Sequence, residues 1–274
     1  MSKRKQALVL VLAIVVLVMT ILLVDGLFLA NKRIRVKNSI IKDEKINEAF
    51  NNFKIVYFSD AHFNLYVNEK RLAHVVDLIN KEKPDLVLFG GDLIDHTQNT
   101  HLTQEEISFL IDTMGSIKAP YGKFAVTGQQ EQSSEYARTT YQSLMQMSEF
   151  EIIDDKVFQI HYQNDYINLI GVTTNYTTGS PDPNKFTLAF THEPKNADLL
   201  SSPDLMIAGF THGGQINIPL FNGVFYNGQP YTNPTQVIDT MRLDISNGVG
   251  TSKIDIRMFA DGDILVYTLR PLEE

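Results

Sequence analysis

The sequence predicts an α/β protein, a two-sheet domain flanked by helices and preceded by one N-terminal transmembrane helix. Two patterns carry this prediction: an uncharged apolar run at residues 7–24, and short β-branched runs that alternate with amphipathic stretches from residue 53 onward. A chain of 274 residues can hold one large α/β domain or two small ones. Cysteine is absent, which excludes disulfides, thiolate metal sites and cysteine nucleophiles.

Residues 1–30 are expected to form a membrane anchor. The run from Ala7 to Val24 is uncharged, and at ~1.5 Å per residue its helix just spans ~30 Å of hydrocarbon. A buried core helix is one alternative, but the run has neither a polar face nor a Gly or Pro break. A cleaved signal peptide is another, but the run is longer than an h-region and Phe28 makes a poor cleavage site. We therefore expect a retained, single-pass anchor.

Basic residues lie on both sides of this anchor, so the positive-inside signal nearly cancels. Three precede the apolar run and four follow it between positions 32 and 37. We expect the short basic tail to stay in the cytoplasm and the folded domain to be extracytoplasmic. The basic flanks either contact lipid headgroups or act only as topology signals.

A polar connector is expected at residues 31–52 and one folded domain at residues 53–274. Residues 1–42 hold eight Lys or Arg and one Asp or Glu, so the remaining residues hold 16 and 31, a net charge of −15. A domain this acidic repels polyanions unless a metal or a local basic patch intervenes. Nucleic acid is therefore not an expected partner, and the sequence indicates no particular protein partner.

Strands are expected where the apolar runs are short and rich in β-branched residues. They are FKIVYFSD (53–60), PDLVLFGGD (84–92), KFAVTG (123–128), YINLIGV (166–172), FTLAFTH (186–192) and DLMIAGFTHGG (204–214). Three helices lie between them. The first begins at the N-cap Asn68 and has one apolar face, the second opens with a capping box of Thr103 and Glu106, and the third covers residues 133–150.

Carboxylates and imidazoles follow four of the expected strands. Asp60 and His62 follow the first, Asp92 ends the second, and His192 and His212 follow two later strands. Because ligands bind beyond the carboxyl ends of strands in open α/β sheets, we expect these side chains to converge. They suit one divalent transition metal such as Mn²⁺, Fe²⁺ or Zn²⁺. Each residue taken alone could instead be a turn former, a helix cap or a hydrogen-bonded core residue.

The other four histidines lack this placement, and we expect them to have structural roles. They are His74, His96, His101 and His161.

The motifs that carry the five placed residues resemble those of the calcineurin-like metallophosphoesterases, especially a membrane-anchored bacterial branch with a Gly-Gly-Gln turn. SDAHFN is similar to the family's Asp-x-His block, GGDLID to its Gly-Asp block, THEP to its isolated-histidine block, and GFTHGGQI to Gly-His-x-His-Gly-Gly-Gln. The tail at residues 245–269 resembles the family's closing strands. The likeness covers nearly everything from residue 53 onward, and it implies a two-sheet sandwich with a metal site at the strand ends.

The resemblance further implies two metals that share Asp92. The first metal would also use Asp60, His62 and His212, and all four of these residues are present. The expected cofactor is therefore one divalent transition metal, Mn, Fe or Zn.

The second metal site is expected to be degenerate. Its implied residues are Asp92, Gln129 in place of an asparagine, the isolated histidine His192, and Phe210 in place of a histidine. Phenylalanine has no lone pair, and glutamine offers its amide oxygen only from a side chain one methylene longer. A second bound metal is therefore doubtful.

The turn VTGQQEQ also lacks the family's catalytic histidine. It lies where the family carries Gly-Asn-His followed by an acidic residue, so Gln130 occupies the histidine position and Glu131 keeps the acid. The histidine can donate a proton toward the leaving oxygen or stabilise the phosphoryl charge, whereas a neutral amide can only hydrogen-bond. The sequence therefore assigns no catalytic residue.

Two functions stay open from the sequence. The first is a divergent, membrane-anchored metallophosphoesterase that hydrolyses a phosphate ester slowly with a single metal. The alternative is a pseudophosphoesterase that serves as a membrane-tethered binding or scaffold module. The intact first ligand set favours a metal-linked role, whereas Phe210 and the two glutamines favour loss of turnover. The expected partners are the lipid bilayer, through the anchor, and a phosphate-ester ligand.

Overall fold

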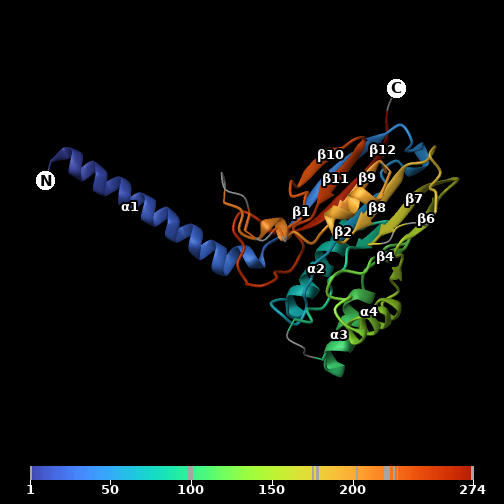
Figure 1. Cartoon of the computed structure of the whole chain (residues 1–274), viewed down its shortest axis with the longest axis horizontal. Helices are drawn as coiled ribbons and strands as arrows, with labels where there is room; N and C mark the ends of the chain where they lie inside the picture. The colour runs from blue at the N-terminus through green and yellow to red at the C-terminus, as the bar shows by residue number, and fades with distance from the viewer. Residues whose placement is uncertain are drawn as a thin grey trace.

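The computed structural model shows two six-stranded sheets packed face to face, with one long helix projecting from an end of the sandwich (Figure 1). The structure describes residues 2–97, 101–174, 176, 179–201, 203–218, 223, 224, 226 and 228–272. The predicted fold class, an α/β two-sheet sandwich flanked by helices, is confirmed.

The first sheet has the strand order β1-β12-β2-β3-β4-β5. Its strands are β1 (Ile34–Asp43), β2 (Lys54–Phe58), β3 (Leu86–Phe89), β4 (Lys123–Ala125), β5 (Glu151–Ile152) and β12 (Gly262–Pro271). The helices α2 (Glu69–Glu82), α3 (Gln104–Gly115) and α4 (Glu135–Met147) connect β2, β3, β4 and β5 in turn. These four strands are parallel, so their carboxyl ends lie at one edge of the sheet.

The second sheet has the strand order β10-β11-β9-β8-β7-β6. Its strands are β6 (Lys156–Tyr162), β7 (Asp165–Val172), β8 (Thr187–Thr191), β9 (Leu205–Ala208), β10 (Thr235–Ile238) and β11 (Met241–Ile245). The central strands β7, β8 and β9 are parallel to one another. Short 3-10 turns at Glu48–Phe50, Pro194–Leu199 and His212–Gly214 complete the domain.

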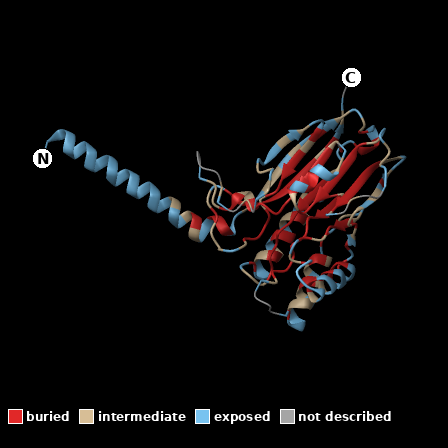
Figure 2. Ribbon diagram, in the orientation of Figure 1, coloured by how far each residue is buried: buried red, intermediate tan, exposed pale blue. Residues whose placement is uncertain are grey.

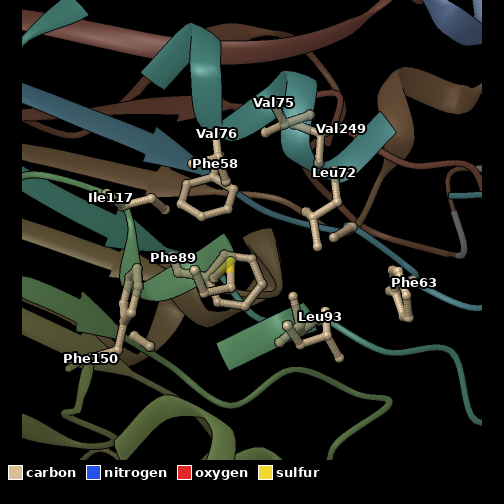
Figure 3. Close-up of a cluster of buried hydrophobic side chains, with 14 of the residues drawn as sticks. Phe58, Phe63, Leu72, Val75, Val76, Phe89, Leu93, Ile117, Phe150 and Val249 are labelled. Carbon is tan, nitrogen blue, oxygen red and sulfur yellow. The ribbon is translucent and has the colours of Figure 1, made fainter. Parts of the chain in front are cut away.

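Alternation along the strands builds two core layers on the first sheet. In β2, Val56 and Phe58 pack under the helices, whereas Ile55 and Tyr57 face the second sheet. Figure 3 shows the helical layer, in which Val76 of α2 lies beside Phe58 and Phe58 packs on Phe89. The sandwich core therefore consists of strand residues from both sheets, and the three helices shield the outer face of the first sheet alone.

The expected helix starts are confirmed. The Asn68 side chain accepts a hydrogen bond from the Arg71 N–H, and Thr103 and Glu106 form the reciprocal capping box of α3. The apolar face of α2 is buried as its spacing predicts.

The apolar helix is confirmed as α1 (Lys3–Val24), and all of its described residues lie outside the protein core (Figure 2). It is the one helix among the described residues that is long and apolar enough to cross a membrane.

The expected connector at residues 31–52 is largely part of the domain, which corrects the prediction. Residues 34–43 form β1, which pairs in parallel with β12 from Ile34 opposite Gly262 to Asp43 opposite Pro271. The basic residues of this stretch suggest a solvated linker, but Lys37 and Arg35 form ion pairs with Asp263 and Asp261 near the other end of the chain.

Deleting residues 1–52 is expected to prevent stable folding, whereas deleting residues 1–29 is expected to leave a folded domain. The longer deletion exposes one edge of β12 and removes the fully buried Phe50, whose ring lies 5.1 Å from Phe53 and 5.5 Å from Tyr162. Losing a buried Phe alone costs about 3–5 kcal/mol, a large part of a typical domain stability. Thermal melting of both fragments by circular dichroism tests this, and equal melting temperatures would contradict it.

Candidate metal centre

Six of the predicted site residues meet beyond the carboxyl ends of four strands. Two follow β2, one follows β3, one follows β8 and two follow β9, so both sheets contribute. None is more than 7% exposed: Asp60, His62, Asp92, His192, Phe210 and His212. The site therefore lies where the carboxyl edges of the two sheets come together.

Five of these residues adopt a left-handed backbone conformation. The φ angles are 55° at Asp60, 46° at His62, 56° at Asp92, 69° at Phe210 and 50° at His212. Left-handed φ values are uncommon for residues other than glycine, and they concentrate where function requires an unusual chain path. The chain therefore turns sharply after β2, β3 and β9.

The first cluster contains Asp60, His62 and His212, whose ligand atoms lie within 4.8 Å of one another. The Nδ1 atom of His62 lies 3.2 Å from an Asp95 carboxylate oxygen, and that of His212 lies 3.3 Å from the Gly250 carbonyl oxygen. These acceptors place a proton on Nδ1 of each ring, so each ring in its neutral form has its lone pair on Nε2.

These two Nε2 atoms face each other at 3.2 Å. Two lone pairs at this distance repel unless a cation or a proton lies between them. Two nitrogens bound to one metal at about 2.1 Å with a tetrahedral angle lie about 3.4 Å apart. The donor set of His62, His212 and Asp60 therefore fits a transition metal.

The second cluster contains Asp60, Asp92 and His192, again with ligand atoms within 4.8 Å. The His192 Nδ1 donates to the Gly90 carbonyl oxygen at 2.8 Å, so Nε2 is the ring nitrogen that would bind a metal once its proton is displaced. That Nε2 lies 3.3 Å from Asp92 Oδ2 without hydrogen-bond geometry, and it is buried without a partner among the described residues. The ring of Phe210 packs against His192 with centroids 5.3 Å apart and an interplanar angle of 79°. An apolar ring thus lies against this imidazole.

The electrostatics of the centre favour positive charge. Burial alone would lower the pKa of His192, but the Asp92 carboxylate beside it, with Asp60, raises that pKa to about 10. Burial would raise the pKa of Asp92, but His192 and His62 hold it below its ordinary value. Burial raises the pKa of Asp60. A divalent cation would likewise compensate the negative charge of the Asp60 and Asp92 carboxylates.

The turn GQQEQ holds Asp92 in place. The Glu131 carboxylate accepts hydrogen bonds from the N–H groups of Asp92, Leu93 and Gly128 at 2.9, 2.9 and 2.8 Å. Burial raises the pKa of Glu131 to about 7. A Cβ at Gly128 would lie 2.3 Å from an Asp92 carboxylate oxygen, which explains the glycine.

The two glutamines line a pocket beside the metal centre and belong to neither ligand cluster. Gln129 is exposed and Gln130 is half-buried, and both line a pocket of about 660 Å³ beside the centre. The Gln130 N–H donates to Asp92 Oδ1 at 2.8 Å, and its side-chain oxygen accepts from the His96 N–H at 3.0 Å. Gln130 is thus a fixed hydrogen-bonding group of the rim. His96 contacts it through the backbone, consistent with its expected structural role.

Two positioning residues were missed from the sequence. Asp95 orients His62 and is itself held by the Thr97 N–H at 2.9 Å. The fully buried Arg257 donates to the His212 carbonyl oxygen at 3.2 Å and to that of Gly250. Asp95 has a local signal, because it lies three residues after Asp92 in GGDLID. Arg257 has none, since its partner His212 is 45 residues away.

Residues 53–237 match the family model for calcineurin-like phosphoesterases, and the chain belongs to this family. It is similar to YkuE, an uncharacterized metallophosphoesterase of Bacillus subtilis (strain 168), with 30% identity over 254 residues that cover 84% of this chain and 83% of the relative. An uncharacterized metallophosphoesterase of Aquifex aeolicus (strain VF5) is 24% identical over 264 residues, covering 86% and 92%. A Bos taurus transmembrane protein with a metallophosphoesterase domain is 25% identical over 282 residues, covering 94% and 62%.

Replacing Asp95 with asparagine is expected to weaken metal binding by about 10–100-fold, because the carboxylate that orients His62 and raises its basicity is lost. Isothermal titration of the chain with Mn²⁺ measures this. Asp77→Asn, on the exposed face of α2, is the matched control and should bind Mn²⁺ like the unchanged chain. Equal affinities for both variants would show that Asp95 does not support the centre.

Proposed function

We propose that this chain is a membrane-anchored, divergent metallophosphoesterase that holds one divalent transition metal and hydrolyses a phosphate ester slowly. The observation that carries the proposal is the pair of imidazole Nε2 atoms of His62 and His212 that face each other at 3.2 Å beside Asp60. In this proposal residues 1–30 form a single-pass anchor and the remaining chain, β1 included, forms the phosphoesterase domain. The domain lies on the extracytoplasmic side, with the short basic tail inside.

The metal would be Mn²⁺, Fe²⁺ or Zn²⁺, held by Asp60, His62, Asp92 and His212. Such an ion polarises a phosphoryl oxygen and lowers the pKa of a bound water. The chain itself fixes the ligands: the Phe210 N–H donates to both Asp60 carboxylate oxygens at 3.1 and 3.0 Å. Each ligand therefore has a hydrogen-bond partner that sets its orientation before substrate arrives.

Two residues around the pocket, Gln130 and Phe210, are the reason for proposing slow turnover. Gln130 replaces the imidazole that would serve the leaving oxygen, and its amide oxygen is already bonded to the His96 N–H. Losing one preorganised donor typically lowers a rate by ~10²–10³. Phe210 leaves His192 with too few partners to hold a second metal.

The alternative is a pseudophosphoesterase that serves as a membrane-tethered binding or scaffold module. Phe210 favours it, because the ring packs on His192 and is only 7% exposed. Hydrolysis of an aryl phosphodiester with added Mn²⁺ separates the two functions. The proposed partners are the bilayer and a phosphate-ester ligand, and the acidic domain argues against nucleic acid.

The purified chain is expected to hold close to one transition metal. Chelation with EDTA should lower its melting temperature, because a ligand at a hundredfold excess over Kd stabilises the folded state by ~2.7 kcal/mol. Elemental analysis and thermal melting are the measurements. His212→Ala should empty the site, while His74→Ala on the exposed face of α2 should not. Two tightly held metals, or none, would contradict the proposal.

The triple change Gln129→Asn, Gln130→His and Phe210→His is expected to add a second metal and to raise aryl phosphodiester hydrolysis at least ~10²-fold. It supplies the missing ligands beside Asp92 and His192 and an imidazole for the leaving oxygen. Single changes should do little, because a ligand without its partners cannot hold the metal and such effects are non-additive. A folded triple variant with no further metal and no activity would favour the scaffold function.

A further inference from the structure

The membrane helix enters the domain without a free linker. After Val24 the chain continues as a π-helix at Asp25–Leu29 and a 3-10 turn at Ala30–Lys32. Gly26, Ala30 and Asn31 are buried in this stretch. The end of the helix is therefore a packed joint, and its position relative to the domain is set by contacts rather than by linker length.

This joint packs on the segment at residues 255–261, near the C-terminal end of the fold. The Gly26 carbonyl oxygen accepts from the Arg257 N–H at 3.2 Å. The Asn31 amide donates to Asp255, at 2.9 Å to the carboxylate and at 3.2 Å to the carbonyl oxygen. The membrane helix thus ends on this segment.

The same segment reaches the metal centre. Arg257, which contacts Gly26 through its backbone, contacts the His212 carbonyl oxygen through its guanidinium at 3.2 Å. Just before it in the chain, Ser252 and Lys253 line the pocket together with Tyr66. Two residue contacts, Gly26 to Arg257 and Arg257 to His212, therefore connect the end of the membrane helix to a candidate metal ligand.

Exposed apolar side chains gather around this joint. Two come from the joint itself, one from the segment 255–261 and two from the loop after Gln215, with exposures of 41–61%. We call this set the collar: Phe28, Leu29, Ile218, Val224 and Phe259. The loop is tied to the segment, because the Asn217 N–H donates to the Met258 carbonyl oxygen at 2.9 Å. Figure 1 shows these loops beside the base of α1.

The collar begins where the hydrocarbon-spanning part of α1 is expected to end. About 30 Å of hydrocarbon takes about 20 helical residues, so a span that begins after Lys5 ends near residue 25. Phe28 and Leu29 follow directly. Exposed apolar residues that cluster beside a membrane helix are the kind of surface that binds the interfacial layer.

We propose that the collar rests in the interfacial layer of the bilayer that α1 crosses, and that the pocket takes a phosphate ester carried by a lipid of that bilayer. The headgroup layer adds about 5–8 Å beyond the hydrocarbon on each side, and the contacts of Arg257 with Gly26 and His212 link the helix end to the pocket, which is the basis for assigning it a lipid phosphate. The substrate class rests on the proposed function, whereas the docking of the collar does not.

Docking of the collar can be measured by tryptophan fluorescence, which does not depend on turnover. The chain contains no tryptophan, so a single introduced one is the only tryptophan that emits. Phe259→Trp in the full chain, reconstituted in phosphatidylcholine nanodiscs, places one fluorophore in the collar. Brominated acyl chains should quench its emission. Met147→Trp, at an exposed position at the end of α4, is the control and should stay unquenched. Equal, weak quenching of both variants would overturn the docking.

The substrate class is tested by lipid binding to the Mn²⁺-loaded full chain. Native mass spectrometry of chains released from nanodiscs with a minor share of phosphatidic acid should show one retained phosphatidic acid. Soluble glycerol 3-phosphate should compete at least ~10-fold more weakly, because it lacks the local concentration of the membrane. Equal competition would overturn a lipid-borne substrate.

A collar variant links the two measurements. Val224→Ser with Phe259→Asn should lower phosphatidic acid retention while leaving Mn²⁺ content unchanged, and asparagine suits the left-handed φ of 56° at position 259. Unchanged retention would separate the pocket from the collar and overturn the proposal. If the proposed function is wrong but the docking is right, the result is different. The chain then contains no Mn²⁺, and the emission of Phe259→Trp is still quenched.

Discussion

Two carboxylates, Asp60 and Asp92, are buried side by side where the two sheets meet, and much of the surrounding structure compensates their charge. Burying an ion costs several kcal/mol unless hydrogen bonds or opposite charge replace its water. The Phe210 N–H and the Ser59 hydroxyl bind Asp60, and the Gln130 N–H binds Asp92. Three imidazoles surround the pair. The left-handed turns at the strand ends are the means by which these groups face inward.

A second set of buried carboxylates ties the two ends of the chain to this centre. Asp263 is fully buried, pairs with Lys37 of β1 and accepts from the Ser246 hydroxyl at 2.6 Å. Asp261 pairs with Arg33, which also pairs with Asp25 at the end of the membrane helix. The basic residues after α1 therefore pair with the carboxylates at residues 261 and 263, and Arg33 extends this set of ion pairs to Asp25.

The changes in the second cluster are chemically consistent with one another. The ring of Phe210 supplies no ligand and packs against His192, and the Gln130 side chain accepts a backbone hydrogen bond at the rim of the pocket. The first cluster keeps its orienting partners, Asp95 and Gly250. A protein with this arrangement can bind a metal and a phosphate oxygen, but it has few groups left for proton transfer. The proposed binding of a membrane-borne phosphate and its proposed slow hydrolysis would use the same residues.

The sequence by itself determined the apolar helix, the helix caps, the six expected strands with the three helices between them, and the residues at the strand ends, because each depends on neighbours within a few positions. Tertiary structure decided the rest. The pairing of β1 with β12 joins residues about 228 positions apart, as in the Arg33 contact to Asp261, and no local pattern encodes it. The facing imidazoles of His62 and His212 are separated by 150 residues, and the Arg257 contact to His212 by 45. These contacts form only when two sheets pack with their carboxyl edges together, since side chains on different strands meet through the strand order and not through the spacing along the chain.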